Sequence, residues 1–178
     1  MPIHGMLDLE TLDVTPSATV LTLGAVKFNP FTDDEPHSEI YIKISIDEQD
    51  KLERTVSDST LEFWSKQDPQ ILEEALDQTH AVSIDDALAQ LNKWMVGIDE
   101  LWGWGYGFDM TILEDLYRQI GKPIPWQFWQ ISDARTLVKR MDRDPRKDMQ
   151  SDLHNALADA YFQAKAIQII FKKFNFEK

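Results

Sequence analysis

The apolar residues change from a strand period to a helix period after the first quarter of the chain, and this change is the strongest constraint on the fold. Up to residue 44 they follow the alternation and β-branched enrichment of strands, whereas from residue 57 they recur at three- and four-residue steps, as in helices. The strand-like runs are 3–10, 19–28 and 40–44, and a loop is expected over 29–36. The predicted helices are 57–67, a stretch after Pro69, 83–96, 109–120, 132–141 and a C-terminal helix reaching 171, with a short strand over 100–104.

Strands followed by helices and one further strand favour an α/β fold, in which helices cover the faces of a mixed sheet. The chain has 178 residues, 43% of them hydrophobic, and shows no repeat or linker. This length suits one domain over 1–178 with its own core.

Composition excludes several classes of protein. The chain has no cysteine, which rules out disulfide frameworks, thiol nucleophiles and cysteine-based zinc sites. No stretch approaches the roughly 18 apolar residues that cross a bilayer, and the first residues carry no basic leader or apolar signal core. We therefore expect a soluble, cytoplasmic protein with no membrane partner.

The formal net charge of −13 argues against binding to phosphate groups. Two features would offset it: clustered carboxylates that hold divalent cations, or a local concentration of basic residues. The segment 139–147 is a local concentration of basic residues, although a solvated charged loop explains it equally well. Five of the chain's 18 basic residues lie in it: Lys139, Arg140, Arg143, Arg146 and Lys147.

Asp8 and Glu10 lie two residues apart in the first strand-like run. Side chains at this spacing point to the same side of a strand, so the two carboxylates converge. Adjacent acids repel each other and raise a pKa unless a cation neutralises them, and a hard divalent ion takes oxygen ligands. Taken alone, however, a pair of this kind most often lies on a solvated strand face.

Asp109 follows the glycine-rich run 103–108 and opens a predicted helix. An N-cap aspartate explains this position by itself, because Asp is a preferred cap. The three glycines alternate with aromatic residues and do not form a dinucleotide-binding fingerprint. They do allow the backbone to approach a ligand closely.

His154 and Asp159 are five residues apart near the start of the last helix. Five steps on a regular helix turn by about 140°, so both side chains cannot face one metal from such a helix. An N-cap at Ser151 or Asp152 would leave His154 in the first turn or in a loop, with Asp159 fixed beside the apolar stripe. A lone histidine near a helix start is more often structural than catalytic.

Taken in order along the chain, these residues resemble the motifs of the DEDDh exonuclease superfamily, which has the ribonuclease H-like fold. The similarity covers nearly the whole chain, and a tyrosine-type relative would carry Tyr where Asn155 stands. The three matching motifs are Asp8-Leu9-Glu10-Thr11, Phe108-Asp109 and His154-Asn155-Ala156-Leu157-Ala158-Asp159. Segments 59–64, 102–103, 128–129 and 133–136 are similar to the branch that contains bacteriophage exodeoxyribonuclease A and bacterial 3′→5′ exoribonucleases.

The resemblance implies a mixed central sheet, with three antiparallel strands first and parallel strands after them, flanked by helices. It implies a metal-dependent 3′→5′ exonuclease that releases nucleoside 5′-monophosphates from the 3′ ends of single-stranded DNA, with RNA as the alternative. Two Mg²⁺ or Mn²⁺ ions would bind, and a homodimer is a further expectation. The implied metal ligands are Asp8, Glu10, Asp109 and Asp159, with His154 as general base.

A pocket for the last nucleotide would lie next to these motifs. Thr11, Leu12 and Phe108 are expected to line it. Trp64 or Tyr106 would stack on a base, although core packing explains Trp64 equally well. Many members carry Asn shortly before the second-motif aspartate, whereas 103–107 holds only Gly, Trp and Tyr. This departure concerns how the substrate is held and leaves the metal ligands intact.

Three other functions compete with this one. A ribonuclease H-type endonuclease would not need the His-x4-Asp motif. An acidic mimic of nucleic acid would explain the charge but not an ordered set of acids. A catalytically inactive binding module would not need all five site residues. The sequence does not choose between DNA and RNA, because the 2′-hydroxyl is recognised by few local contacts.

Overall fold

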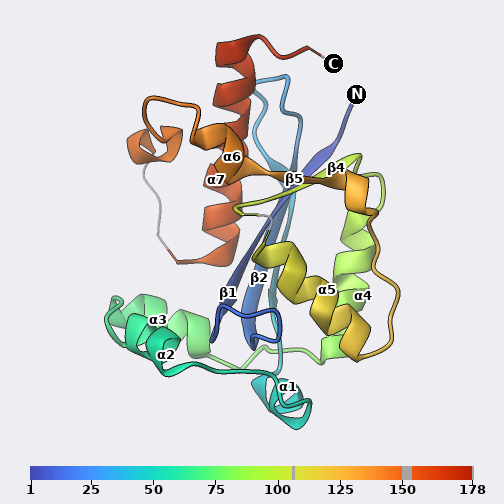
Figure 1. The fold of residues 1–178 in the computed structure, drawn as a ribbon, viewed down its shortest axis with the longest axis vertical. Coiled ribbons are helices and arrows are strands. Elements are labelled where there is room, and N and C mark those ends of the chain that lie inside the picture. Colours follow the sequence, from blue (N-terminus) through green and yellow to red (C-terminus); the bar gives the residue numbers. More distant parts are fainter. Residues whose placement is uncertain (106, 150–153, 178) are drawn as a thin grey trace.

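A five-stranded mixed sheet forms the centre of the computed structural model, which describes residues 1–105, 107–149 and 154–177 (Figure 1). Its order is β3-β2-β1-β4-β5. Antiparallel pairing joins β1 to β2 and β2 to β3, and parallel pairing joins β1 to β4 and β4 to β5. The predicted mixed sheet is therefore confirmed. The strands are β1 (His4–Thr11), β2 (Val20–Phe28), β3 (His37–Lys43), β4 (Glu100–Gly103) and β5 (Ile131–Asp133).

Helices cover both faces of the sheet (Figure 1). On one face, α4 (Ile84–Met95) and α5 (Asp109–Gln119) pack against the odd-numbered residues of β1, such as Leu7 and Leu9. On the other, α6 (Ala134–Val138) and α7 (Ala156–Phe174) pack around Met6. Because side chains alternate along a strand, Asp8 and Glu10 point to the same face as Met6, toward α7.

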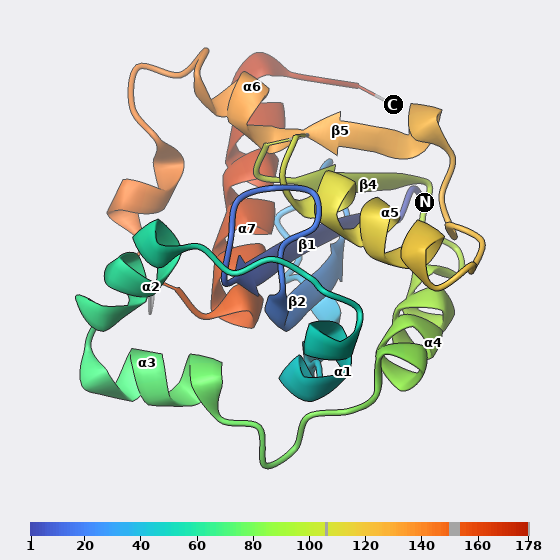
Figure 2. The same ribbon diagram turned by 60° about the horizontal axis from the view of Figure 1, so that its bottom comes forward.

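Three short helices lie at one end of the sheet, near the end of β1 (Figures 1 and 2). They are α1 (Ile46–Lys51), α2 (Asp58–Ser65) and α3 (Pro69–Leu76), and two 3₁₀ turns, η1 (Phe128–Gln130) and η2 (Pro145–Asp148), lie later in the chain. Trp64 ties α2 to the sheet, since its indole N–H donates to the carbonyl of Thr11 at 2.9 Å. α2 is thereby held beside the strand that carries the first motif.

Two predicted helices differ from those observed. The segment 132–141 divides into β5 and the shorter α6, because the side chain of Asp133 accepts a hydrogen bond from the N–H of Arg135 and starts the helix there. The last helix begins later than expected. Asn155 is its N-cap and accepts from the N–H groups of two residues, so the predicted cap at position 151 or 152 is wrong. Ser151 and Asp152 themselves lie outside the described residues.

Within the described ranges, no helix combines the length and the apolar character needed to span a membrane.

Candidate active site

β1 and α7 together position the first motif. Asp8 pairs with Gly24 and Glu10 with Thr22 in the antiparallel register of β1 and β2. The carboxylate of Asp8 accepts a hydrogen bond of 2.8 Å from Nε2 of Gln163 on α7. Gln163 is only 2% exposed, and its other polar atom, Oε1, is buried without a hydrogen-bond partner among the described residues. Sequence reasoning missed Gln163; the available signal was its place one turn after Asp159 on the same helix.

Gly24 allows the first turn of α7 to lie directly against the sheet. A Cβ atom at this position would be 2.2 Å from the backbone carbon of Ala156 and from the backbone nitrogen of Leu157. No side chain fits in that space. The missing side chain at Gly24 therefore brings the start of α7, and Asp159 with it, close to the acids of β1.

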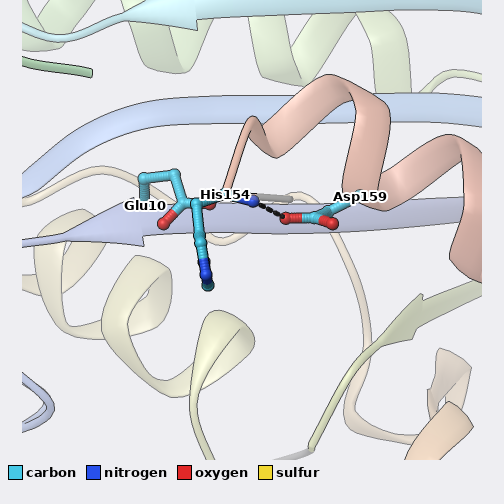
Figure 3. A group of neighbouring side chains, drawn as sticks. All are labelled: Glu10, His154 and Asp159. Carbon is cyan, nitrogen blue, oxygen red and sulfur yellow. Dashed lines mark hydrogen bonds between the residues drawn. The ribbon is translucent and has the colours of Figure 1, made fainter. Parts of the chain in front are cut away.

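His154 and Asp159 converge with Glu10 where α7 begins (Figure 3). One potential ligand atom from each residue lies within 4.8 Å of the others. The backbone N–H of His154 donates to Oδ2 of Asp159 at 3.1 Å, and His154 adopts a left-handed conformation with φ of 67°. His154 thus precedes the helix and turns back toward it. This turn explains how residues five apart reach one site, which a regular helix does not allow.

Asp109 is the first residue of α5 and does not act as its N-cap. Phe108 occupies the cap position without a side-chain hydrogen bond. The carboxylate of Asp109 instead accepts from the backbone N–H groups of Leu9, at 3.1 Å, and Trp104, at 3.3 Å. It is 2% exposed and joins β1 to the segment that follows β4. The aspartate of the second motif therefore lies beside the first motif.

The four carboxylates all have raised pKa values. Burial raises the pKa of Asp8 well above its usual range, and the charges of Asp109, Glu10 and Asp159 add to this. Burial, then the charges of Asp159 and Asp109, raises the pKa of Glu10 to about 8. Burial raises the pKa of Asp109 to about 7 despite the hydrogen bonds from Leu9 and Trp104, and it also raises the pKa of Asp159.

These raised pKa values indicate negative charge that lacks a compensating partner. Within the described part of the chain, none of the four carboxylates forms an ion pair with a lysine or arginine. Divalent ions with oxygen ligands would compensate such a cluster. The donor set therefore fits a divalent metal centre.

A pocket of about 380 Å³ opens beside Glu10. Thr11, Phe108 and Trp64, which we predict to bind substrate, lie among its lining residues, whereas Leu12 packs in the core. Trp64 is 2% exposed, and Tyr106 lies outside the described residues. The remaining lining residues are Leu9, Glu10, Val14, Ser59, Thr60 and Phe63.

Phe63 is more exposed than Trp64 and Phe108, the other aromatic residues that line this pocket in the described part of the chain. It is 41% exposed, and its ring centroid lies 5.0 Å from that of His154, nearly perpendicular to it. Sequence reasoning chose the neighbouring Trp64 instead. Consecutive residues of a helix point in different directions, and only the packing of α2 decides which of the two faces inward.

Known proteins with similar sequences are nucleases. A family model described as the 3′-5′ exoribonuclease Rv2179c-like domain matches residues 3–171. The exodeoxyribonuclease of Enterobacteria phage T4 is 30% identical over an alignment of 161 positions, which covers 76% of this chain and 70% of that protein.

Solved structures share the fold at low sequence identity. Cell-death related nuclease 4 (CRN-4) matches with a TM-score of 0.68 and 16% identity over 97% of this chain, which spans 64% of the length of that nuclease. The nuclease domain of 3′hExo, a DEDDh family member bound to rAMP, matches with a TM-score of 0.62 and 13% identity over 96% of this chain and 92% of that domain. The predicted ribonuclease H-like fold is thereby confirmed.

Proposed function

Because the chain belongs to the family of the 3′-5′ exoribonuclease Rv2179c-like domain, we propose that it removes nucleotides from the 3′ ends of single strands and releases nucleoside 5′-monophosphates. The family match supports an exonuclease, as the motifs predict. One observation carries the finer proposal: Glu10, His154 and Asp159 gather beside a pocket lined by Glu10, and the buried carboxylates of Asp8 and Asp109 are within electrostatic reach of this group.

The carboxylates would hold two Mg²⁺ or Mn²⁺ ions. Asp8 would contact both, Glu10 and Asp159 would complete one site, and Asp109 would support the other. Bound there, the ions would supply an activated water and stabilise charge on the leaving 3′ oxygen. The hydrogen bond from Gln163 would leave Oδ2 of Asp8 free for a metal, since it uses Oδ1.

His154 would accept the proton of the attacking water at a ring nitrogen. Its backbone is tied to Asp159, and its ring packs against Phe63 on α2. The ring is therefore placed between a metal ligand and the wall of the pocket, where a reacting phosphate would lie.

The pocket beside Glu10 would take the 3′-terminal nucleoside. The exposed ring of Phe63 suits stacking on a base, and Trp64 behind it would hold α2 in position through its hydrogen bond to Thr11. An exonuclease would bind a chain terminus in this pocket, whereas a ribonuclease H-type endonuclease would have to accept the interior of a strand. This difference separates an exonuclease from a ribonuclease H-type endonuclease.

The comparisons support both sugars, because the family description names RNA whereas the phage T4 relative is an exodeoxyribonuclease. The experiment therefore digests single-stranded DNA and RNA of the same base sequence, labelled at the 5′ end, with Mg²⁺ or Mn²⁺. An EDTA sample and the Asp8→Asn variant are the controls.

A ladder that shortens from the 3′ end, absent from both controls, is the expected result, and the faster ladder identifies the sugar. Internal fragments produced from the start of the reaction would favour an endonuclease. Intact strands of both kinds with every metal would contradict the proposed function. The homodimer stays a prediction, which sedimentation of the purified chain checks.

A further inference from the structure

Two arginines contact the segment that joins β4 to α5. The guanidinium carbon of Arg146 in η2 lies 3.5 Å from the centroid of the Trp104 ring. The guanidinium of Arg135 in α6 lies 3.6 Å from the place that a Cβ atom of Gly105 would occupy. The backbone N–H of Trp104 also donates to Asp109. Both cationic groups therefore adjoin the segment that holds one proposed metal ligand.

Each arginine is also within electrostatic reach of one acid of the site. The charge of Arg135 opposes the rise that burial causes in the pKa of Asp109, and the charge of Arg146 does the same for the pKa of Asp159. Neither arginine forms an ion pair with these acids among the described residues. They lie next to the carboxylate cluster without neutralising it.

Arg146 is held in place, in contrast to its basic neighbours. Its Nη2 and Nε atoms bind the carboxylate of Asp144 at 2.9 and 3.3 Å, and its side chain is 28% exposed. Nη1 makes no hydrogen bond within the described residues, so one edge of the guanidinium stays available. Arg143, by comparison, is 60% exposed and pairs with Asp148, itself 65% exposed. Ion pairs between exposed side chains of this kind do little to hold those side chains in one position.

Arg135 is exposed, and its guanidinium group is accessible to a ligand. The side chain makes no hydrogen bond or ion pair in the described part of the chain; only its backbone is bonded, through its N–H to Asp133 and through its carbonyl to the N–H of Lys139. A planar group with five donors, placed beside a site that handles phosphodiesters, suits phosphate oxygens. Its position at the start of α6 is remote from α2, which lines the nucleoside pocket (Figures 1 and 2).

We propose that Arg135 and Arg146 bind phosphate groups of the strand on the 5′ side of the scissile bond. The inference rests on the proposed function and adds a second subsite to it. The terminal nucleoside occupies the pocket by α2, the scissile phosphate lies at the carboxylates, and the preceding phosphates run along the two arginines. It also distinguishes Arg146 from the rest of the basic segment 139–147. A chain with a net charge of −13 thereby obtains local positive charge where the strand leaves the site.

The test compares two substrates. One is a single-stranded oligonucleotide; the other is the p-nitrophenyl ester of thymidine 5′-monophosphate, which has a scissile phosphodiester but no preceding phosphate. Arg135→Gln and Arg146→Gln are measured beside Arg143→Gln, a control from the same basic segment. For the oligonucleotide, KM is expected to rise about tenfold in each test variant, the effect of losing one charged contact. The salt dependence of binding is expected to become shallower by about one phosphate contact.

With Mn²⁺ at saturation, which offsets the loss of positive charge beside Asp109 and Asp159, the ester is expected to be cleaved with nearly unchanged kcat/KM by both test variants. Arg143→Gln is expected to behave as the wild type with both substrates. Arg146→Lys keeps the charge and should restore most of the salt dependence. Oligonucleotide KM values equal to that of Arg143→Gln would overturn the inference. So would an equal loss with both substrates together with a lower melting temperature, which would mean that the arginines only hold the loop. If Arg146→Gln does not fold, the exposed Arg135 carries the test. Wild-type protein inactive on both substrates would contradict the proposed function itself.

Discussion

Gln163 of α7 donates a hydrogen bond of 2.8 Å to the carboxylate of Asp8 on β1. This contact joins residues 155 positions apart and orients the acid at the centre of the carboxylate cluster. Groups that orient metal ligands typically matter by about 10–100-fold in metal affinity or activity. Three residues of the site depend on α7: this glutamine, His154 and Asp159.

We predict that Gln163→Leu lowers both the affinity for Mn²⁺ and kcat by about 10–100-fold, because Asp8 loses its orienting donor. Calorimetric titration with Mn²⁺ measures the affinity without requiring turnover. Gln168→Leu is the matched control: Gln168 is 3% exposed on the same helix, but it bonds to the carbonyls of Asn29 and Asp34. Equal losses of metal affinity in both variants would reduce the role of Gln163 to packing.

Gly24→Ala is expected to destabilise the protein and to reduce activity together, because the added methyl group would lie 2.2 Å from the backbone of α7. Overpacking of this kind costs about 1–3 kcal/mol, and here it displaces the turn that carries Asp159. Denaturant unfolding and the exonuclease assay measure the two effects. Gly107→Ala adds the same methyl group where nothing lies within 4 Å, and its free energy of unfolding should stay near that of the wild type. An active, fully stable Gly24→Ala variant would show that α7 can shift without consequence.

The acids of the site are expected to make the metal-free protein less stable as pH rises. The pKa of Asp109 is raised to about 7 and that of Glu10 to about 8, above the ordinary values that hold in the unfolded chain. The protonated forms therefore favour the folded state, and this contribution is lost as pH rises through about 7 to 8. Glu10→Gln should lose less free energy of unfolding between pH 6 and pH 9 than the wild type does. The same loss in both proteins would mean that Glu10 titrates normally.

Metal binding is expected to release protons near neutral pH, because cations bind the ionised carboxylates. Mn²⁺ affinity should rise with pH up to about 8, the value to which the pKa of Glu10 is raised. Calorimetry at pH 7 in two buffers with different ionisation enthalpies counts the protons released. Glu10→Gln should release fewer, and equal heats in both buffers would mean that the acids are already ionised before the metal binds.

His154→Ala separates two roles for this residue, since its ring nitrogen lies within 4.8 Å of potential ligand atoms of Glu10 and Asp159. As a general base, His154 should contribute about 10²–10⁴-fold to kcat with little effect on Mn²⁺ affinity. A loss of Mn²⁺ affinity as large as that of Glu10→Gln would instead identify His154 as a metal ligand.

Phe63→Ala and Trp64→Ala are expected to act differently although the residues are neighbours. Phe63 is 41% exposed in the pocket, so its loss should raise KM by the equivalent of about 1–3 kcal/mol of base stacking. Trp64 is 2% exposed, and its removal should cost about 3–5 kcal/mol of stability. Steady-state kinetics and thermal melts make the comparison. An unchanged KM in Phe63→Ala would show that Phe63 does not contact the substrate. An unchanged KM in a folded Trp64→Ala would show the same for Trp64.

The sequence by itself determined the motifs and most elements of the fold. The two-residue spacing of Asp8 and Glu10 predicts one strand face because side chains alternate along any strand. The apolar stripe of the last helix similarly predicts that Asp159 lies at the edge of a buried face. These are local relationships, fixed by backbone geometry over a few residues. The metal-ligand set that we propose follows from the resemblance to the exonuclease motifs, of which these local relationships form part.

Only the tertiary structure decided which other residues contact and position the residues of these motifs. Gln163 reaches Asp8, Gly24 admits α7, Phe63 rather than Trp64 presents its ring, and Arg146 stacks on Trp104. The tertiary structure also places His154 before the start of α7, with Asn155 as the N-cap of that helix. Each of these depends on how elements distant in the chain pack together. The local period of the apolar residues predicts which face of a helix or strand is buried. It does not predict which side chain of another element packs against that face.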